Sequence, residues 1–62
     1  MSWRLISYNK RSAKKYGWHP SWLASTLNEF DQNLIEAIKL FQYNHDLTVD
    51  GKVGPNTFRR LL

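Results

Sequence analysis

The most informative part of the chain is the segment 37–58, which reads AIKLFQYNHDLTVDGKVGPNTF. Apolar residues recur at helical spacing in its first half, and a polar stretch with an Asp-Gly pair and a Gly-Pro pair follows. Asp50-Gly51 is typical of a tight turn, because glycine accepts a positive φ and an aspartate side chain can bond nearby amides. Pro55 suits the first position of a helix, where the amide hydrogen that proline lacks would have no partner. The segment therefore predicts a helix, a structured loop over 46–55 and a last helix.

The helix before this loop is expected to run from Gln32 to Asn44. Asn28 or Asp31 can cap it, since either side chain can accept a hydrogen bond from a free amide of the first turn. Its core-facing stripe and the apolar face of the last helix follow from residues that recur three or four positions apart. For the helix over residues 32–44 these are Leu34, Ile38, Phe41 and His45, flanked by Ile35 and Ala37. For the last helix they are Phe58, Leu61 and Leu62.

Alternation of apolar and polar residues in the loop predicts an extended chain whose side chains enter the core. The apolar positions are Leu47, Val49 and Val53. Two very short paired strands are an alternative for this stretch, although so small a sheet would be marginal.

A further helix is predicted over residues 2–16, with Ser2 as N-cap and Gly17 as its stop. Its inward face would carry Leu5, Asn9, Ala13 and Tyr16, with Trp3 and Ile6 on the flank. The cations Lys10, Arg11, Lys14 and Lys15 would form the opposite side, which we interpret as a solvated face; a patch for a polyanion is the alternative.

An aromatic connector, residues 18–23, follows this helix. Pro20 fits the first turn of a short helix, which requires His19 to be extended. We expect Trp18 and Trp22 to pack in the core, because aromatic rings dominate small cores; stacking on sugar rings is the alternative. The three helices together predict an all-α fold, a small three-helix bundle with the structured Asp-Gly loop between its last two helices.

The composition is that of one small globular domain, residues 1–62, with 42% hydrophobic and 23% charged residues. No cysteine is present, so the chain forms no internal disulfide. The net charge of +4 suits an anionic partner, such as nucleic acid, an acidic membrane surface or a cell-wall polymer. No apolar run approaches the ~20 residues of a membrane span, and Leu5-Ile6 is far shorter than the core of a signal peptide.

The sequence offers no catalytic or metal-binding constellation. Only His19 and His45 could ligate a metal, and neither has partners at a zinc-site spacing. No serine lies in a G-x-S-x-G context, and the carboxylates sit where caps and turns would use them. So short a chain is also expected to offer a shallow binding surface rather than an enclosed pocket. We therefore expect a binding module that is not an enzyme and needs no cofactor.

Residues 34–62 resemble the peptidoglycan-binding-like domain family. The family pattern is A-[VI]-x-x-F-Q, a short link, G-L-x-x-D-G-x-x-G-x-x-T and a helix with an apolar end. It is matched here by residues 37–42, 46–51 and 53–58 and by Leu61. Asp46 stands where the family commonly has glycine, but aspartate also tolerates the left-handed conformation that ends a helix. Residues 2–23 fit the family's three-helix plan more loosely.

The resemblance implies a non-catalytic, monomeric module that binds the glycan strand or stem peptide of peptidoglycan and holds a linked hydrolase on the bacterial wall. A chain that begins with Met1 and shows no signal peptide looks more like a phage endolysin, released through a holin, than a secreted autolysin. Much of the motif has a structural explanation, because Gln42, Asp50 and Thr57 can bond the loop. The candidate ligand contacts are Gln42, Tyr43, Asn44, Asp50, Thr57, Arg59, Trp18 and Trp22.

Two other functions remain open from the sequence. The first is a basic nucleic-acid or protein-interaction module. A helix-turn-helix is disfavoured, because about ten residues separate the last two helices where that motif has three or four. The second is a folding or autoinhibitory unit similar to the pro-segments of some metalloproteases.

Overall fold

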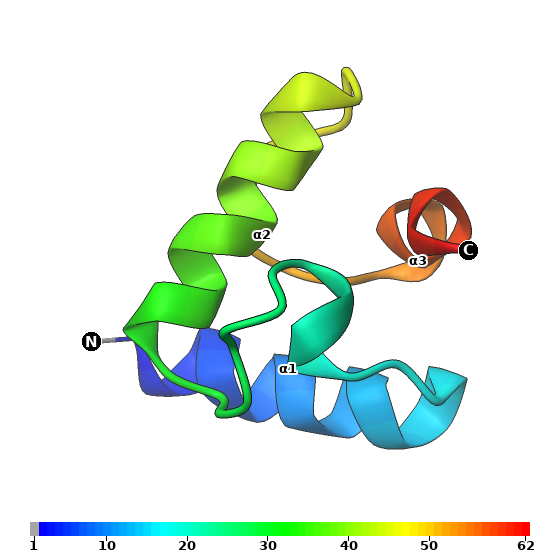
Figure 1. Cartoon of the computed structure of the whole chain (residues 1–62). Coiled ribbons are helices and arrows are strands. Elements are labelled where there is room, and N and C mark those ends of the chain that lie inside the picture. The colour runs from blue at the N-terminus through cyan, green and yellow to red at the C-terminus, as the bar shows by residue number, and fades with distance from the viewer. Residues whose placement is uncertain (1) are drawn as a thin grey trace.

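The fold consists of three α-helices and one short 3-10 helix in a computed structural model that describes residues 2–62 (Figure 1). The elements are α1 (Trp3–Tyr16), η1 (Pro20–Trp22), α2 (Gln32–Asn44) and α3 (Pro55–Leu61). No strand occurs in residues 2–62, so the all-α prediction is confirmed and the paired-strand alternative is excluded there. Met1, on which the expectation about the natural start of the protein rests, lies outside the described residues.

Local signals in the sequence set both ends of α1. The Ser2 side chain accepts a hydrogen bond from the Leu5 amide at 3.3 Å. Gly17 ends the helix with φ +81°, and its amide donates to the Ala13 carbonyl at 2.8 Å. Glycine reaches this left-handed conformation without a steric penalty, so both predicted caps are confirmed.

The ends of α2 and α3 also follow the sequence. Asp31, one of the two candidate caps, accepts a hydrogen bond from the Leu34 amide at 3.1 Å. After α2, Asp46 adopts φ +55°, the left-handed conformation expected of it. Pro55 occupies the first turn of α3, as predicted.

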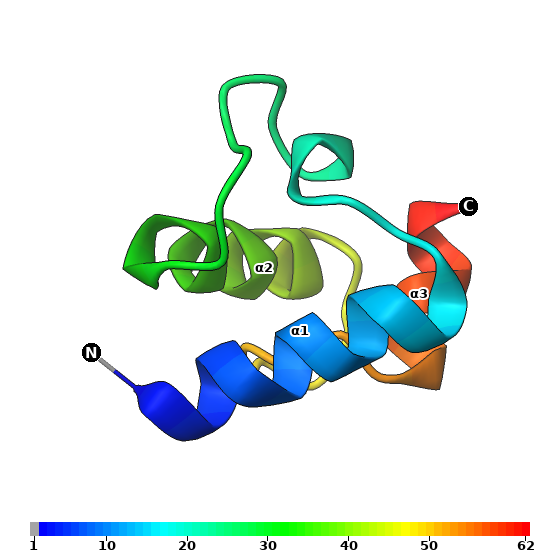
Figure 2. The same ribbon diagram turned by 90° about the horizontal axis from the view of Figure 1, so that it is seen from below.

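The core lies where the three helices meet and is closed by the chain between α1 and α2 (Figure 2). Its buried centre consists of Trp18, Leu34, Ile38 and Val53. The predicted inward stripe of α2 is therefore confirmed at its first two positions. Phe41 and His45 are only half-buried and pack against each other with ring centroids 4.2 Å apart.

Three apolar residues that we expected in the core lie at the surface. Val49 and Leu62 are 48% and 78% exposed, and Leu62 follows the last residue of α3. Trp22 is 44% exposed, so the expectation of a core position is wrong for this ring and confirmed only for Trp18. A 3-10 turn that starts at Pro20 carries Trp22 to the rim of the core.

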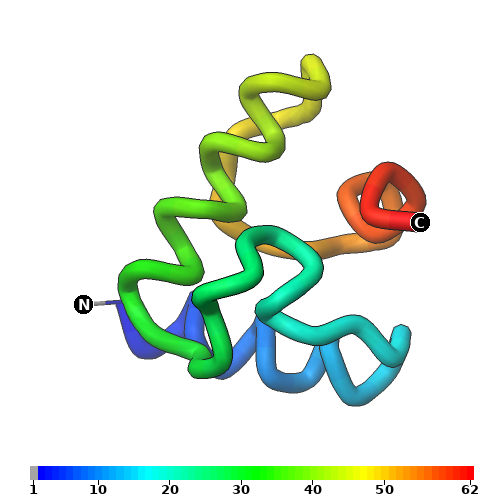
Figure 3. The backbone as a smooth tube through the Cα atoms, viewed as in Figure 1, coloured from blue at the N-terminus to red at the C-terminus, as the bar shows by residue number. Residues whose placement is uncertain are grey.

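The chain from α2 to α3, residues 45–54, returns along the molecule between α1 and α2 before it reaches α3 (Figure 3). We call it the α2–α3 loop. In residues 2–62, no helix combines the length and the apolar character needed to cross a membrane.

Candidate functional site

The side chain of Gln42 on α2 holds the α2–α3 loop. It is only 1% exposed, and its Nε2 donates to Asp50 Oδ1 at 2.9 Å, to the Lys52 carbonyl at 2.9 Å and to Thr57 Oγ1 at 3.2 Å. Its Oε1 accepts hydrogen bonds from the backbone amides of Asp50 at 3.1 Å and Gly51 at 3.0 Å. The structural role expected of the Gln42 amide is confirmed. The Thr57 hydroxyl accepts from Gln42, whereas we expected it to bond the loop amides.

Two polar side chains of α1 hold the same loop from the other side. Asn9 donates through Nδ2 to the Gly51 carbonyl and accepts through Oδ1 from the Val53 amide, both at 2.9 Å. The hydroxyl of Ser12 donates to the Val53 carbonyl and accepts from Trp18 Nε1 at 2.9 Å. A loop without regular secondary structure thus has its buried backbone groups bonded by side chains, which fixes its shape.

The sequence assigned no role to Asn9 or Ser12. The available signal was Asn9 itself, a polar residue in the middle of the inward face of α1. Burial of an amide side chain without hydrogen bonds is costly, so such a position requires partners from another part of the chain. Both of its partners lie more than forty positions away in the sequence, and their identity could not be inferred from residues near Asn9.

The loop and α3 enclose a surface hollow of about 620 Å³. We call it the loop hollow. Its volume falls within the ~300–1,000 Å³ of small-molecule sites, yet it lies at the surface, as expected for so short a chain. Its wall contains both carboxylates and cations, together with neutral hydrogen-bonding groups. The polar residues of this wall are Tyr8, Asp46, Thr48, Asp50, Lys52, Asn56, Thr57, Arg59 and Arg60.

Three of the predicted contact residues line the loop hollow: Asp50, Thr57 and Arg59. Arg59 is exposed, whereas Thr57 is buried and committed to Gln42. Asp50 Oδ1 accepts both from Gln42 Nε2 and from the Lys52 amide at 2.9 Å, which leaves Oδ2 for other partners. Gln42 itself lies behind the wall of the hollow, because loop groups occupy both ends of its amide.

The other predicted contacts lie elsewhere. Tyr43 and Asn44 are exposed at the end of α2, outside the wall of the loop hollow. Trp18 is 1% exposed and presents no surface to a ligand, since its ring packs against Phe30 and its Nε1 is bonded to Ser12.

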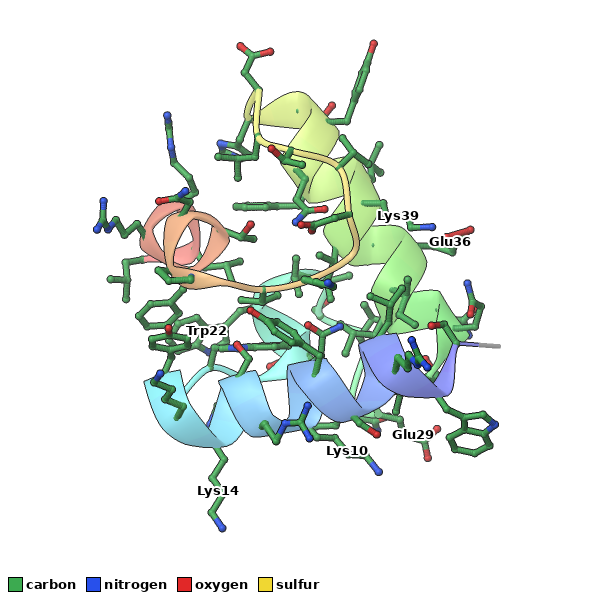
Figure 4. The ribbon with its side chains drawn as sticks, turned by 180° about the vertical axis from the view of Figure 1, so that it is seen from behind. Lys10, Lys14, Trp22, Glu29, Glu36 and Lys39 are labelled. Atoms are coloured by element: carbon green, nitrogen blue, oxygen red, sulfur yellow. The ribbon has the colours of Figure 1, made fainter. Side chains whose placement is uncertain are left out.

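Trp22 belongs to a stack of aromatic rings between α1 and α3 (Figure 4). Its ring lies 6.5 Å from that of Phe58 at an interplanar angle of 18°, and Phe58 lies 5.0 Å from Tyr16 at 20°. His19 meets the edge of Trp22 at 6.4 Å. This stack stabilises the docking of α3 and leaves part of the Trp22 ring at the surface.

Sequence reasoning gave no ligand contact to the remaining polar residues of the loop hollow. Four of them are polar positions between the apolar residues of the loop and α3: Thr48, Lys52, Asn56 and Arg60. In the sequence, only this alternation of polar and apolar residues indicated that they would lie at the surface. Tyr8 could not be associated with the hollow, because it lies on α1, far from the loop in sequence.

Within residues 2–62, no group of three or more His, Cys, Asp or Glu side chains is placed to hold a metal ion. The polar groups around the loop hollow are instead suited to hydrogen bonding and to pairing with a carboxylate, for which an arginine guanidinium has matching geometry.

Comparison with protein families gives one match. The model of the family described as "Putative peptidoglycan binding domain" matches residues 14–61. The chain belongs to this family. Comparisons with curated proteins and with solved structures gave no match.

This peptidoglycan-binding domain belongs to a family of binding domains, not of catalytic ones, and peptidoglycan is its ligand class. The resemblance seen in the sequence is therefore confirmed. The family match includes Gln42, the α2–α3 loop and α3. It begins at residue 14, so Asn9 and Ser12, which complete the anchoring of the loop, lie outside it.

Proposed function

We propose that this domain is a monomeric targeting module that binds the glycan strand or stem peptide of peptidoglycan in the loop hollow. One observation supports this proposal above the others: the family match includes the α2–α3 loop and α3, which form the hollow. The backbone of this loop is fixed by hydrogen bonds to Gln42, Asn9 and Ser12. A rigid loop presents its polar groups without a large ordering cost on binding.

The chemistry of the hollow supports both parts of this ligand. The Arg59 guanidinium can pair with a stem-peptide carboxylate through two parallel hydrogen bonds. Thr48, Asn56 and the free Oδ2 of Asp50 offer donors and acceptors for sugar hydroxyls and peptide amides. The exposed part of Trp22 and the side chains of Tyr43 and Asn44 are outlying contacts for a ligand that extends beyond the hollow.

Retention on purified insoluble peptidoglycan tests the proposal. We expect the isolated domain to be retained at low and moderate salt, and Arg59→Ala to weaken binding by roughly 10-fold or more, as for loss of a charge-assisted hydrogen bond. Lys14→Ala is the matched control, since it removes one positive charge that points away from the other helices (Figure 4). Retention on DNA but not on peptidoglycan would overturn the proposal in favour of a nucleic-acid module.

We also propose that the domain directs a linked hydrolase, such as that of a phage endolysin released to the wall through a holin. Removal of residues 1–62 from the full-length protein should then lower its lysis of intact walls and leave its cleavage of soluble wall fragments unchanged. Equal loss of both activities would contradict a targeting role.

A further inference from the structure

The cations of α1 divide into two groups that point in different directions. Arg4, Arg11 and Lys15 recur with Tyr8 at positions i, i+4, i+7 and i+11, which places them on one side of the helix. Lys10 and Lys14 lie on another side and project away from α2 and α3 (Figure 4). All five cations are exposed.

The first group borders two surface hollows beside the loop hollow, of about 440 and 300 Å³. Arg4 and Lys52 line the larger, Lys15 lines the smaller, and Tyr8 and Arg11 line both. We call these five residues the basic stripe. From residue 4 to residue 15 it extends for about 16 Å, at ~1.5 Å per residue of helix.

The basic stripe carries positive charge alone. In the part of the chain that the structure describes, neither hollow has a carboxylate in its wall, and the sequence of α1 contains no Asp or Glu. The loop hollow differs, because Asp46 and Asp50 offset its cations. A row of cations without counter-charges is suited to a ligand that carries an anion at every repeat.

Two of the three aromatic rings that line these hollows, those of Tyr8 and Tyr16, are already engaged. Lys52 Nζ lies 5.6 Å from the centre of the Tyr8 ring. Tyr16 stacks on Phe58 with ring centroids 5.0 Å apart, and Lys15 Nζ lies 5.4 Å from the centre of the Tyr16 ring. Single-stranded nucleic acids are held by successive bases that stack on free rings, and here only Trp3, at 72% exposure, offers one.

We propose that the basic stripe binds a linear polyol-phosphate polymer of the kind attached to bacterial walls. Each repeat of such a chain carries a phosphodiester anion and no base, which matches a row of cations along which Trp3 is the one free ring. The choice of a wall-borne polymer rests on the proposed function, whereas the anionic repeat is inferred from the stripe itself. The domain thereby holds the wall at two places, peptidoglycan in the loop hollow and the polyanion along α1.

The test compares two double variants of one helix, Arg11→Gln/Lys15→Gln and Lys10→Gln/Lys14→Gln. Both remove two exposed charges at neighbouring positions, so they share net charge and differ in which side of α1 they alter. Binding to soluble poly(glycerol phosphate) is measured by calorimetry over a series of salt concentrations. Far-UV circular dichroism establishes that both variants are folded.

We expect the wild type to bind the polymer at 0.1 M salt. Loss of two phosphate contacts should lower the salt slope by about 1.4 and the affinity at 0.1 M salt by roughly 25-fold in Arg11→Gln/Lys15→Gln. Lys10→Gln/Lys14→Gln should change the affinity by less than about 3-fold, since its charges lie off the stripe. No binding by the wild type, or equal losses in the two variants, would overturn the proposal.

Two further ligands separate this proposal from the alternatives. On peptidoglycan stripped of phosphate polymers with hydrofluoric acid, the Arg11/Lys15 variant should be retained like the wild type, whereas Arg59→Ala should not. If the wild type bound the polymer but was not retained on the stripped peptidoglycan, only the proposed function would be refuted. An oligonucleotide with the same number of phosphates should bind more weakly than the polymer, and tighter binding would assign the stripe to nucleic acid instead.

Discussion

Replacement of Gln42 by leucine tests the central structural inference, that one side chain of α2 holds the α2–α3 loop. Leucine fits the buried position and the helix but can make none of the five hydrogen bonds of the Gln42 amide. Asp50 and Lys52 are exposed, so water can replace the bonds that their groups lose. The Gly51 amide and the Thr57 hydroxyl belong to buried residues and would lose a partner.

The expected loss of stability follows from these two buried groups. At about 1–3 kcal/mol for each unsatisfied group, Gln42→Leu should lower the free energy of unfolding by about 3 kcal/mol. A chain of this length has a total stability of roughly 3–9 kcal/mol, so the loss is a large share of it. In a domain of this size it corresponds to a fall in Tm of about 12–24 °C.

Urea unfolding followed by far-UV circular dichroism measures the change directly. Tyr43→Leu is the matched control, because it places the same residue at the next position of α2, where the side chain is 73% exposed. That control should change the free energy of unfolding by less than about 0.5 kcal/mol. If Gln42→Leu cost less than about 1 kcal/mol, the inference that its hydrogen bonds fix the loop would be refuted.

Three further predictions concern the loop and its anchors. Gly51→Ala should lower the free energy of unfolding in urea by more than Gly17→Ala does. Both glycines have a positive φ, but only at Gly51 would a Cβ lie 3.2 Å from a core side chain. Equal losses in the two variants would contradict this steric argument. Ser12→Ala should lower the free energy of unfolding by about 1–3 kcal/mol, because it leaves Trp18 Nε1 buried without an acceptor. Ser12→Thr is the control, since it retains the hydroxyl. An equal loss in both variants would show that side-chain volume at this position matters and the hydrogen bond does not. Gln42→Glu should be destabilised at pH 7, because the new carboxylate would face acceptor oxygens. Burial and these oxygens would raise its pKa in the folded state above the unfolded value of about 4.3, so the stability relative to wild type should be highest below pH ~4 and fall as the pH rises through the folded-state pKa; a relative stability independent of pH would contradict that reasoning.

Local signals in the sequence were sufficient for the helices. Ser2, Gly17, Asp31 and Pro55 act on the backbone within four residues of themselves, so their effect can be inferred without the rest of the chain. Helical spacing likewise identified the inward stripe of α2 around Leu34 and Ile38. Gln42 was recognisable too, because the loop that it binds begins only a few positions later.

The two tryptophans show where local reasoning ends. Trp18 and Trp22 have the same spacing from the connector's proline and the same apolar character, yet one is 1% exposed and the other 44%. The difference arises from contacts with distant residues: Trp18 reaches the core and Ser12, whereas Trp22 stacks on Phe58 at the rim. The residues that neighbour a tryptophan in the sequence do not show which distant residues it will contact in the fold.

The sequence by itself determined the helices, their caps and the family resemblance, because these depend on residues close together along the chain. Only the tertiary structure decided which residues lie together on the two surfaces that we propose as ligand sites. The loop hollow and the basic stripe each combine residues of α1 with residues more than forty positions later, Tyr8 with Lys52 in both. Their positions are fixed by the hydrogen bonds of Asn9 and Ser12 to the loop, which form only when the chain has folded.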